Sequence, residues 1–241
     1  MMRDGGSLVT PTEPPRLGRH IALGTLSFAI CFAAWGLVSA FAVRFRERLH
    51  LSATETALLV AVPVLLGALA RLPIGILADR FGGRLVFSVL MAIVAVPVYL
   101  VPAAETYRSL LVAAFFLGLA GSSFAVGVGY VSRWAPADRQ GSVLGIYGMG
   151  NIGQSAAVFL GPLLAGVIGW EGVFHAVAAL LVASAIGFAV LAQDAPARGA
   201  PKGIGAIASI LVHGRLSWAL AAFYFLTFAV SLPSPSTCRR C

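Results

Sequence analysis

Arg71 is the residue of this chain whose surroundings most strongly suggest chemistry. It lies in TETALLVAVPVLLGALARLPIGILADRFGGR, residues 54–84. About two dozen mostly apolar residues in this stretch are enough to cross a bilayer as a helix. An arginine inside such a helix costs on the order of 3 kcal/mol on insertion scales, so it usually faces a protein interior or a watery cavity.

The guanidinium of Arg71 is suited to binding an anion. Its planar fork of donors matches a small planar oxyanion that accepts two hydrogen bonds. No acidic residue lies deep in an apolar run, so Arg71 has no obvious carboxylate partner at its own depth. Alternatively, Arg71 bonds to backbone carbonyls or pairs with a group in a second half of the protein. The acidic residues are Asp4, Glu13, Glu47, Glu55, Asp79, Glu105, Asp138, Glu171 and Asp194.

The positions of the acidic residues also bear on the energy source, if the chain carries an anion across the membrane. Proton-coupled carriers often titrate an Asp, Glu or His within the membrane. The apolar runs offer none of these at mid-depth. Exchange of one anion for another would need no such group.

A Gly-rich stretch, GIYGMGNIGQ, spans residues 145–154. Each glycine costs a helix about 1 kcal/mol relative to alanine, so Gly145, Gly148, Gly150 and Gly153 indicate a need for close backbone approach. The amide of Asn151, among them, could donate to an oxyanion for which the glycines leave room. The alternative is helix packing through small residues. We assign that role to the glycines at 118, 121, 127 and 129.

A charged, Gly-rich turn follows the apolar stretch that holds Arg71. Asp79 falls at the end of this predicted helix, where it could accept hydrogen bonds from the amino terminus of a neighbouring helix. The glycines permit a tight reversal of the chain. A plain charged turn would look similar. The residues of interest in this turn are Gly75, Asp79, Arg80, Gly82, Gly83 and Arg84.

The composition is that of an integral membrane protein. Of 241 residues, 59% are hydrophobic and 11% are charged, whereas a soluble domain keeps about a quarter of its residues charged. The formal net charge is +8, but the arginines sit mainly at the ends of apolar runs and form no dense basic stripe. We therefore expect a lipid bilayer as a partner and no nucleic acid.

The sequence does not indicate an enzyme. It contains no nucleophile–base set, metal cluster or phosphate loop. The four histidines are scattered, and Cys238 and Cys241 form one lone CxxC. We expect no catalytic residues, no cofactor and no metal site.

The apolar runs predict six membrane spans joined by short loops. A polar, Pro-containing tail, residues 1–19, is expected to be disordered and cytoplasmic. Residues 20–192 form the six-helix bundle, with a loop at 44–53. A Pro- and Gly-rich linker at 193–214 leads to a seventh span at 215–232, and residues 233–241 match neither a helix end nor a further span. The expected spans are about 20–43, 54–78, 85–101, 109–132, 141–168 and 173–192.

We expect the protein to lie in the inner (plasma) membrane of the cell. The positive-inside rule then favours an amino terminus on the cytoplasmic side. The cluster from Arg44 to Arg48 is an exception to that pattern. The side with the amino terminus holds Arg3, Arg16, Arg19, Arg80, Arg84, Arg133, Arg139, Arg198, Lys202 and Arg215; the other side holds Arg44, Arg46, Arg48 and Arg108.

GILADRFGGR resembles the motif between helices 2 and 3 of the major facilitator superfamily. Together with GIYGMGNIGQ and the LeuGlyProLeu of residues 160–163, it makes the chain similar to the nitrate/nitrite porters of that superfamily. In that family an arginine of helix 2 binds the anion, and a Gly-rich signature with a central asparagine lies in helix 5. The resemblance implies that Arg71, Asn151, Gly150 and Gly153 hold nitrate or nitrite, and that the turn motif helps to lock a cytoplasmic gate.

The resemblance also implies that aromatic rings flank the anion. Family members have an aromatic residue in helix 4, which Phe124 fits, and a Tyr and a Phe in helix 7, which Tyr224 and Phe228 fit. These rings would sandwich a planar anion. The alternative for each ring is a place in the apolar core.

The resemblance covers roughly residues 20–230. Family members have twelve spans, with a second anion-binding arginine in helix 8 and a second Gly-rich signature in helix 11; this sequence contains neither. Departure begins near Ser231, so we expect an amino-terminal half that is truncated or frameshifted, with the carboxy-terminal half as its missing partner.

These observations predict an all-α integral membrane protein: the six-helix amino-terminal bundle of a major facilitator plus a partial seventh helix. The expected function of the intact protein is nitrate or nitrite transport by alternating access. One alternative is a carrier of another small anion or an organic acid. The other is an inactive half-transporter fragment.

Overall fold

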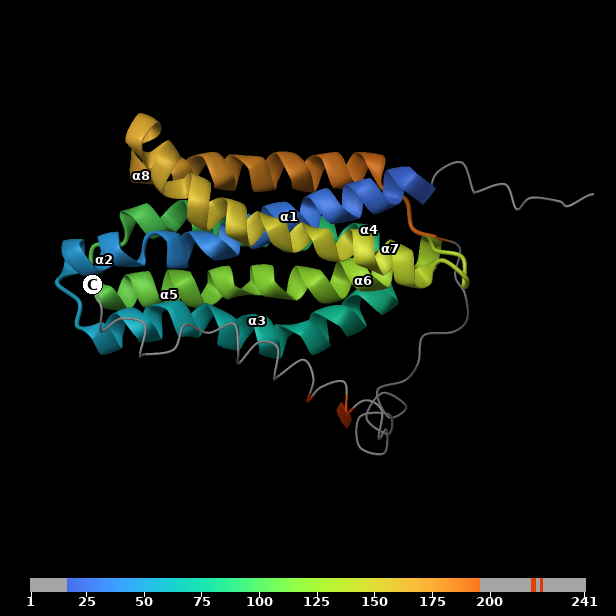
Figure 1. The fold of residues 1–241 in the computed structure, drawn as a ribbon, viewed down its shortest axis with the longest axis horizontal. Helices are drawn as coiled ribbons and strands as arrows, with labels where there is room; N and C mark the ends of the chain where they lie inside the picture. The colour runs from blue at the N-terminus through green and yellow to red at the C-terminus, as the bar shows by residue number, and fades with distance from the viewer. Residues whose placement is uncertain (1–16, 196–217, 220–221, 223–241) are drawn as a thin grey trace, which may run out of the picture. The chain divides into compact units, whose positions relative to one another are not determined.

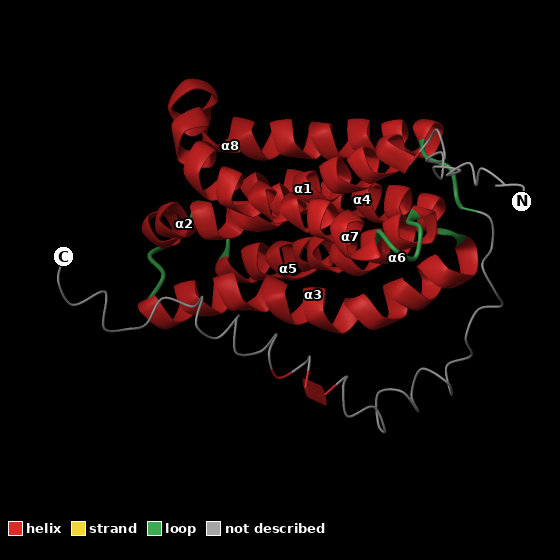
Figure 2. Ribbon diagram, turned by 45° about the vertical axis from the view of Figure 1, so that its right-hand side comes forward, coloured by secondary structure: helices red, strands yellow, loops and turns green. Residues whose placement is uncertain are grey.

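The computed structural model describes residues 17–195, 218–219 and 222. In this part of the chain all regular structure is helical (Figures 1 and 2). The α-helices are α1 (Leu17–Ala40), α2 (Ala42–Leu49), α3 (Ala53–Phe81), α4 (Gly83–Leu100), α5 (Tyr107–Leu117), α6 (Ser123–Trp134), α7 (Gln140–Gly148) and α8 (Ile152–Leu191). Three short 3₁₀ segments lie between them: η1 (Val101–Ala103), η2 (Gly118–Ser122) and η3 (Met149–Asn151).

The helices form six apolar crossings, as the apolar runs predicted. α1, α3 and α4 are one crossing each, and η2 joins α5 to α6 in a fourth. α7, η3 and α8 form one run of 52 residues. Gly169 divides that run, because its φ of 75° and ψ of 156° are not helical. Only glycine adopts this conformation readily, so the chain breaks where the expected spans 141–168 and 173–192 leave a gap.

The expected tail, linker, seventh span and final segment fall almost entirely outside the described residues. Of the candidate site residues, Tyr224 and Phe228 lie there as well. The prediction of a loop at 44–53, in contrast, is wrong. Residues Ala42–Leu49 form α2, whose Phe45 is buried while the arginines on either side of it are exposed.

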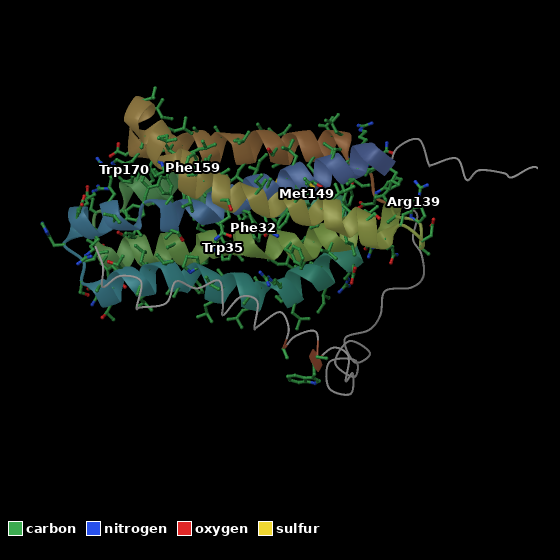
Figure 3. The ribbon with its side chains drawn as sticks, viewed as in Figure 1. Phe32, Trp35, Arg139, Met149, Phe159 and Trp170 are labelled. Carbon is green, nitrogen blue, oxygen red and sulfur yellow. The ribbon has the colours of Figure 1, made fainter. Side chains whose placement is uncertain are left out.

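The Trp170 ring lies beside two arginines of α2. The guanidinium carbons of Arg44 and Arg48 lie 6.0 and 5.1 Å from its ring centroid. Phe45 packs edge-on to the same ring, with centroids 5.8 Å apart. Arg48 also donates to the carbonyl oxygen of Pro102 at 3.1 Å. Cation–π contacts thus give this exception to the charge pattern a packing role at the end of the bundle where Figure 3 labels Trp170.

α1 is the most buried of the spanning helices, and it packs against α8, α6 and η3. Small residues permit the close contacts. A Cβ added at Gly24 would lie 2.9 Å from a Val131 methyl, and one added at Gly36 would lie 2.9 Å from the Gln154 carbonyl oxygen. α1 is therefore the helix against which α8, α6 and η3 are positioned.

α3 is the least buried spanning helix, and many of its leucines are exposed. Leu65, Leu69 and Leu72 are each more than half exposed. In a bilayer such a face needs no protein cover, because lipid tails are as apolar as leucine. α3 also contains Pro63 and Pro73, which remove backbone donors and account for its bowed course in Figure 2.

Candidate functional site

Arg71 lies half-buried on α3, and its Nε donates a hydrogen bond to the carbonyl oxygen of Gly121 at 3.3 Å. That carbonyl belongs to η2, on the neighbouring crossing. Within residues 17–195 no carboxylate lies within ion-pair distance of the guanidinium, and neither Nη group has a hydrogen-bond partner there. One of five N–H donors is thus held by the backbone, while the other four remain free to bind a ligand.

Glycines bring α3 and η2 close enough for this bond. A Cβ added at Gly67 would lie 2.8 Å from the Gly118 carbonyl oxygen, and one added at Gly121 would lie 3.3 Å from the Gly67 Cα. Gly67 is one helical turn before Arg71 on the same face of α3. The packing role expected for Gly118 and Gly121 is confirmed, and Gly127 likewise lies against the Tyr147 ring. At Gly129, by contrast, an added Cβ would meet nothing within 4 Å.

A row of three aromatic residues on α1, one of which lies beside Gly121, was not among the sequence-based candidates. The Phe28 and Phe32 centroids are 4.3 Å apart, and those of Phe32 and Trp35 are 5.2 Å apart. Trp35 Cε2 lies 3.9 Å from where a Cβ of Gly121 would be. Figure 3 shows Phe32 and Trp35 near the middle of the bundle's length. Their spacing of i, i+4 and i+7 was the available signal that they share one face.

Gly150 and Gly153 lie against α1. A Cβ at Gly150 would overlap the Phe28 ring, and one at Gly153 would overlap the Ala29 carbonyl. Both glycines are buried. These contacts are those of the helix-packing alternative, so the spacing of these two glycines is explained without a ligand.

Asn151 has an exposed side chain, on the other side of η3 from these contacts. Its Nδ2 donates to the carbonyl oxygen of Gly148 at 3.1 Å, within its own turn. No hydrogen bond joins Asn151 to Arg71 in the described part of the chain. The structure therefore places these two candidates on separate elements, α3 and η3. Phe28 of α1 packs against Gly150 of η3, and Trp35 lies beside Gly121, the residue that Arg71 contacts.

Phe124 is half-buried on α6 and belongs to the same aromatic group. Its ring centroid lies 5.6 Å from that of Phe28 and 6.1 Å from that of Tyr147. Tyr147 is fully buried and donates its hydroxyl to the Ser123 carbonyl oxygen at 3.1 Å. Phe124 thus sits between the core and the exposed surface, a position that suits either of the roles considered for it.

In the turn motif, Asp79 pairs with Arg133 of α6, with 2.7 Å between Oδ1 and Nη2. The expectation that Asp79 accepts from a helix amino terminus is wrong, because Asp194 does so instead. Its Oδ1 accepts from the backbone N–H of Arg84 at 2.9 Å, in the first turn of α4. Arg84 completes the link by donating from Nε to the Ala189 carbonyl oxygen at 2.8 Å.

The glycines of the motif have distinct roles. Gly82 has a φ of 91° and lies against the Asp194 carboxylate, and Gly83 packs on the Tyr130 ring. Gly75 has no atom within 4 Å of a would-be side chain. Arg80 is exposed, with its guanidinium carbon 5.5 Å from the Phe81 centroid. The motif therefore ties the α3–α4 turn to α6 and to the end of α8.

Six apolar crossings joined by short turns define a multi-pass membrane protein. The sequence profile of the Major Facilitator Superfamily matches residues 23–237, and the chain belongs to that superfamily. Within it, the similar proteins carry the names of nitrate and nitrite porters, which confirms the resemblance seen in the sequence. They are named as transporters and not as enzymes.

Three of these relatives show the extent of the similarity. The chain is 45% identical over 152 residues to the "Probable nitrate/nitrite antiporter NarK1" of Thermus thermophilus, covering 63% of the chain and 34% of that protein. It is 34% identical over 209 residues to the "Nitrite extrusion protein" of Bacillus subtilis (strain 168), covering 87% and 53%. It is 34% identical over 214 residues to the "Probable nitrate transporter NarT" of Staphylococcus haemolyticus, and this match covers 88% of the chain and 54% of that protein. The chain spans about half the length of these relatives, or less.

Solved structures agree on the fold. A bacterial homologue of the human lysosomal transporter Spinster, in an inward-facing and unoccupied conformation, superposes with a TM-score of 0.67 at 19% identity. The match covers 79% of this chain and 46% of that one. The same homologue in its inward-facing and occupied conformation superposes with a TM-score of 0.64. At this identity the likeness concerns the fold of the bundle.

Proposed function

We propose that this chain supplies the amino-terminal bundle of a nitrate or nitrite transporter of the inner membrane, with its amino terminus in the cytoplasm. The observation that carries the proposal is the guanidinium of Arg71. It is half-buried, lacks a carboxylate partner among residues 17–195 and keeps both Nη groups free. The names of the relatives favour nitrate and nitrite over other small anions.

The hydrogen bond to Gly121 orients the guanidinium for this task. With Nε held by the backbone, the edge formed by the two Nη groups is the one left for a ligand. Two parallel N–H donors match two oxygens of a planar oxyanion. Trp35 lies beside Gly121, the residue that holds Nε.

Asn151 and Phe124 are proposed as further contacts on the anion's route. Asn151 would have to exchange its bond to the Gly148 carbonyl for a bond to the anion. Its exposed position allows that exchange. Gly150 and Gly153 would then serve the site indirectly, by seating η3 and α8 on α1.

Alternating access completes the proposal. In this mechanism one bundle rocks against a second around a site near the midplane. About half of the length of the Bacillus and Staphylococcus relatives lies outside the matched region, which is enough for a second bundle. The Asp79–Arg133 and Arg84–Asp194 contacts would then stabilise the end of this bundle at a cytoplasmic gate.

Anion binding by the purified chain tests the proposal. We expect calorimetric titration to show that nitrate and nitrite bind more tightly than chloride, cyanate or carboxylates. Arg71→Lys should weaken nitrate binding by about tenfold or more, the value of one charge-assisted hydrogen bond. Arg46→Lys, on exposed α2, is the matched control. Equal nitrate affinity in the Arg71→Lys variant would remove Arg71 from the site.

Vesicles test transport separately. Chain reconstituted into vesicles is expected to exchange external nitrate for internal nitrite when the carboxy-terminal half is co-expressed with it. Flux that remains at the level of empty vesicles, although nitrate binds, would favour an inactive fragment. A preference for carboxylates or cyanate would favour another carrier of the same superfamily.

A further inference from the structure

A groove of about 690 Å³ runs between α4 and α5, away from Arg71. Its walls are almost wholly apolar. Exposed side chains from α4, η1 and α5 form most of it, namely Ile93, Val96, Leu100, Ala103, Val112 and Phe116. The volume is within the roughly 300–1,000 Å³ of sites that bind small molecules.

Arg108 gives one end of this groove a positive charge. It lies in the first turn of α5, is exposed and lines the groove. Within residues 17–195 it has neither an ion pair nor a side-chain hydrogen bond, although the acidic Glu105 is only three residues away. Arg108 is the one charged residue among the described residues that line the groove.

The other polar group of the lining is already engaged. Ser109 shares a capping box with Thr106, and its hydroxyl donates to the Thr106 carbonyl oxygen at 2.8 Å. A small free anion would therefore meet one guanidinium and an otherwise apolar wall. An amphiphile with a single anionic head and a long apolar tail would match the whole groove.

The position of the groove across the membrane also matches that of a lipid. Its charged end coincides with the ends of two crossings, where α4 finishes at Leu100 and α5 starts at Tyr107. Tyr99 is 57% exposed at the same level. Tyrosines are enriched where a membrane protein crosses the headgroup region. Arg108 is thus at headgroup height, while Ile93 and Phe116 extend towards the hydrocarbon.

We propose that the groove between α4 and α5 binds one anionic phospholipid, with its phosphate on Arg108 and an acyl chain along the apolar walls. This lipid site is separate from the anion site at Arg71 and stands whether or not nitrate is the transported ion. It would fix α4 and α5 to each other on the outer surface of the bundle.

Native mass spectrometry of the purified full chain tests the proposal. The probes are phosphatidylglycerol and phosphatidylcholine with identical acyl chains. Phosphatidylglycerol should bind about fivefold more tightly, the ratio that one arginine near a bilayer surface supplies. Arg108→Gln should abolish this preference, Arg108→Lys should retain it, and Arg46→Gln, which removes an exposed arginine outside the groove, should leave it unchanged.

Two further measurements locate the lipid. Ala113→Phe narrows the groove without changing charge, so it should reduce binding of both lipids by a similar factor. Inorganic phosphate at millimolar concentration should not displace phosphatidylglycerol. A preference that survives Arg108→Gln or is lost equally in Arg46→Gln, unchanged binding in Ala113→Phe, or displacement by phosphate would each overturn the proposal.

Discussion

The Nε of Arg71 and the carbonyl oxygen of Gly121 are 3.3 Å apart, and this bond joins α3 to the 3₁₀ segment of the neighbouring crossing. A 3₁₀ segment has poorer internal hydrogen-bond geometry than an α-helix, so its carbonyls can accept an outside donor. The bond holds one edge of the guanidinium and leaves the other edge free. The contact between the two crossings therefore uses Nε, whereas the anion binding that we propose would use the two Nη groups of the same side chain.

Replacing Arg71 with methionine should stabilise the folded chain while abolishing nitrate binding. The substitution removes a half-buried charge from the middle of a span, which costs on the order of 3 kcal/mol on insertion scales, and loses one backbone hydrogen bond. We expect a net gain of about 1–2 kcal/mol. Thermal unfolding in detergent, with and without nitrate, measures both effects. A clear loss of stability would instead make Arg71 a structural residue.

Gly67→Ala should destabilise the bundle, because the added Cβ would lie 2.8 Å from the Gly118 carbonyl oxygen. Forcing α3 away from η2 costs about 1–3 kcal/mol and moves Arg71 away from Gly121. Gly75→Ala is the control on the same helix, since nothing lies within 4 Å of its Cβ. That change should be neutral or stabilise by up to about 1 kcal/mol. Equal melting temperatures for the two variants would contradict the proposed close contact.

The Gly-rich stretch offers a second matched pair. A Cβ at Gly153 would overlap the Ala29 carbonyl, whereas one at Gly148 meets nothing within 4 Å. Gly153→Ala should therefore destabilise the chain by about 1–3 kcal/mol, and Gly148→Ala should be tolerated or slightly stabilising. Chemical unfolding followed by circular dichroism compares them. If Gly148→Ala impairs nitrate binding without loss of stability, Gly148 serves the ligand and not the packing.

Asp194→Ala should cost about 0.5–2 kcal/mol, as expected for removal of a carboxylate that accepts from a backbone N–H at a helix amino terminus. Its Oδ1 accepts from Arg84 at 2.9 Å. Asp138→Ala is the control, since this side chain is 77% exposed and lies 4.0 Å from the Arg139 guanidinium. Exposed pairs of that kind contribute about 0–1 kcal/mol. Hydrogen exchange at the first turn of α4 should rise only in the Asp194 variant, and unchanged exchange there would rule out the capping role.

The six crossings, the Gly169 turn and the membership of the family were all predictable from the sequence. A run of about 20 apolar residues in a membrane must satisfy its own backbone, so it becomes a helix whatever its neighbours are. Likewise, the position of a lone arginine within such a run depends only on counting residues. Arg71 was identified in this way.

The partners of these residues depended on packing between segments far apart in the chain. Gly121 is 50 residues from Arg71, and Asp194 is 110 residues from Arg84. From the sequence we expected Asp79 to accept from a helix amino terminus, and Asp194 was named only among the acidic residues. Only the arrangement of α3, α4, α6 and α8 decided between them. The same holds for Arg44 and Arg48 of α2, whose contacts with the Trp170 ring depend on the chain turn at Gly169.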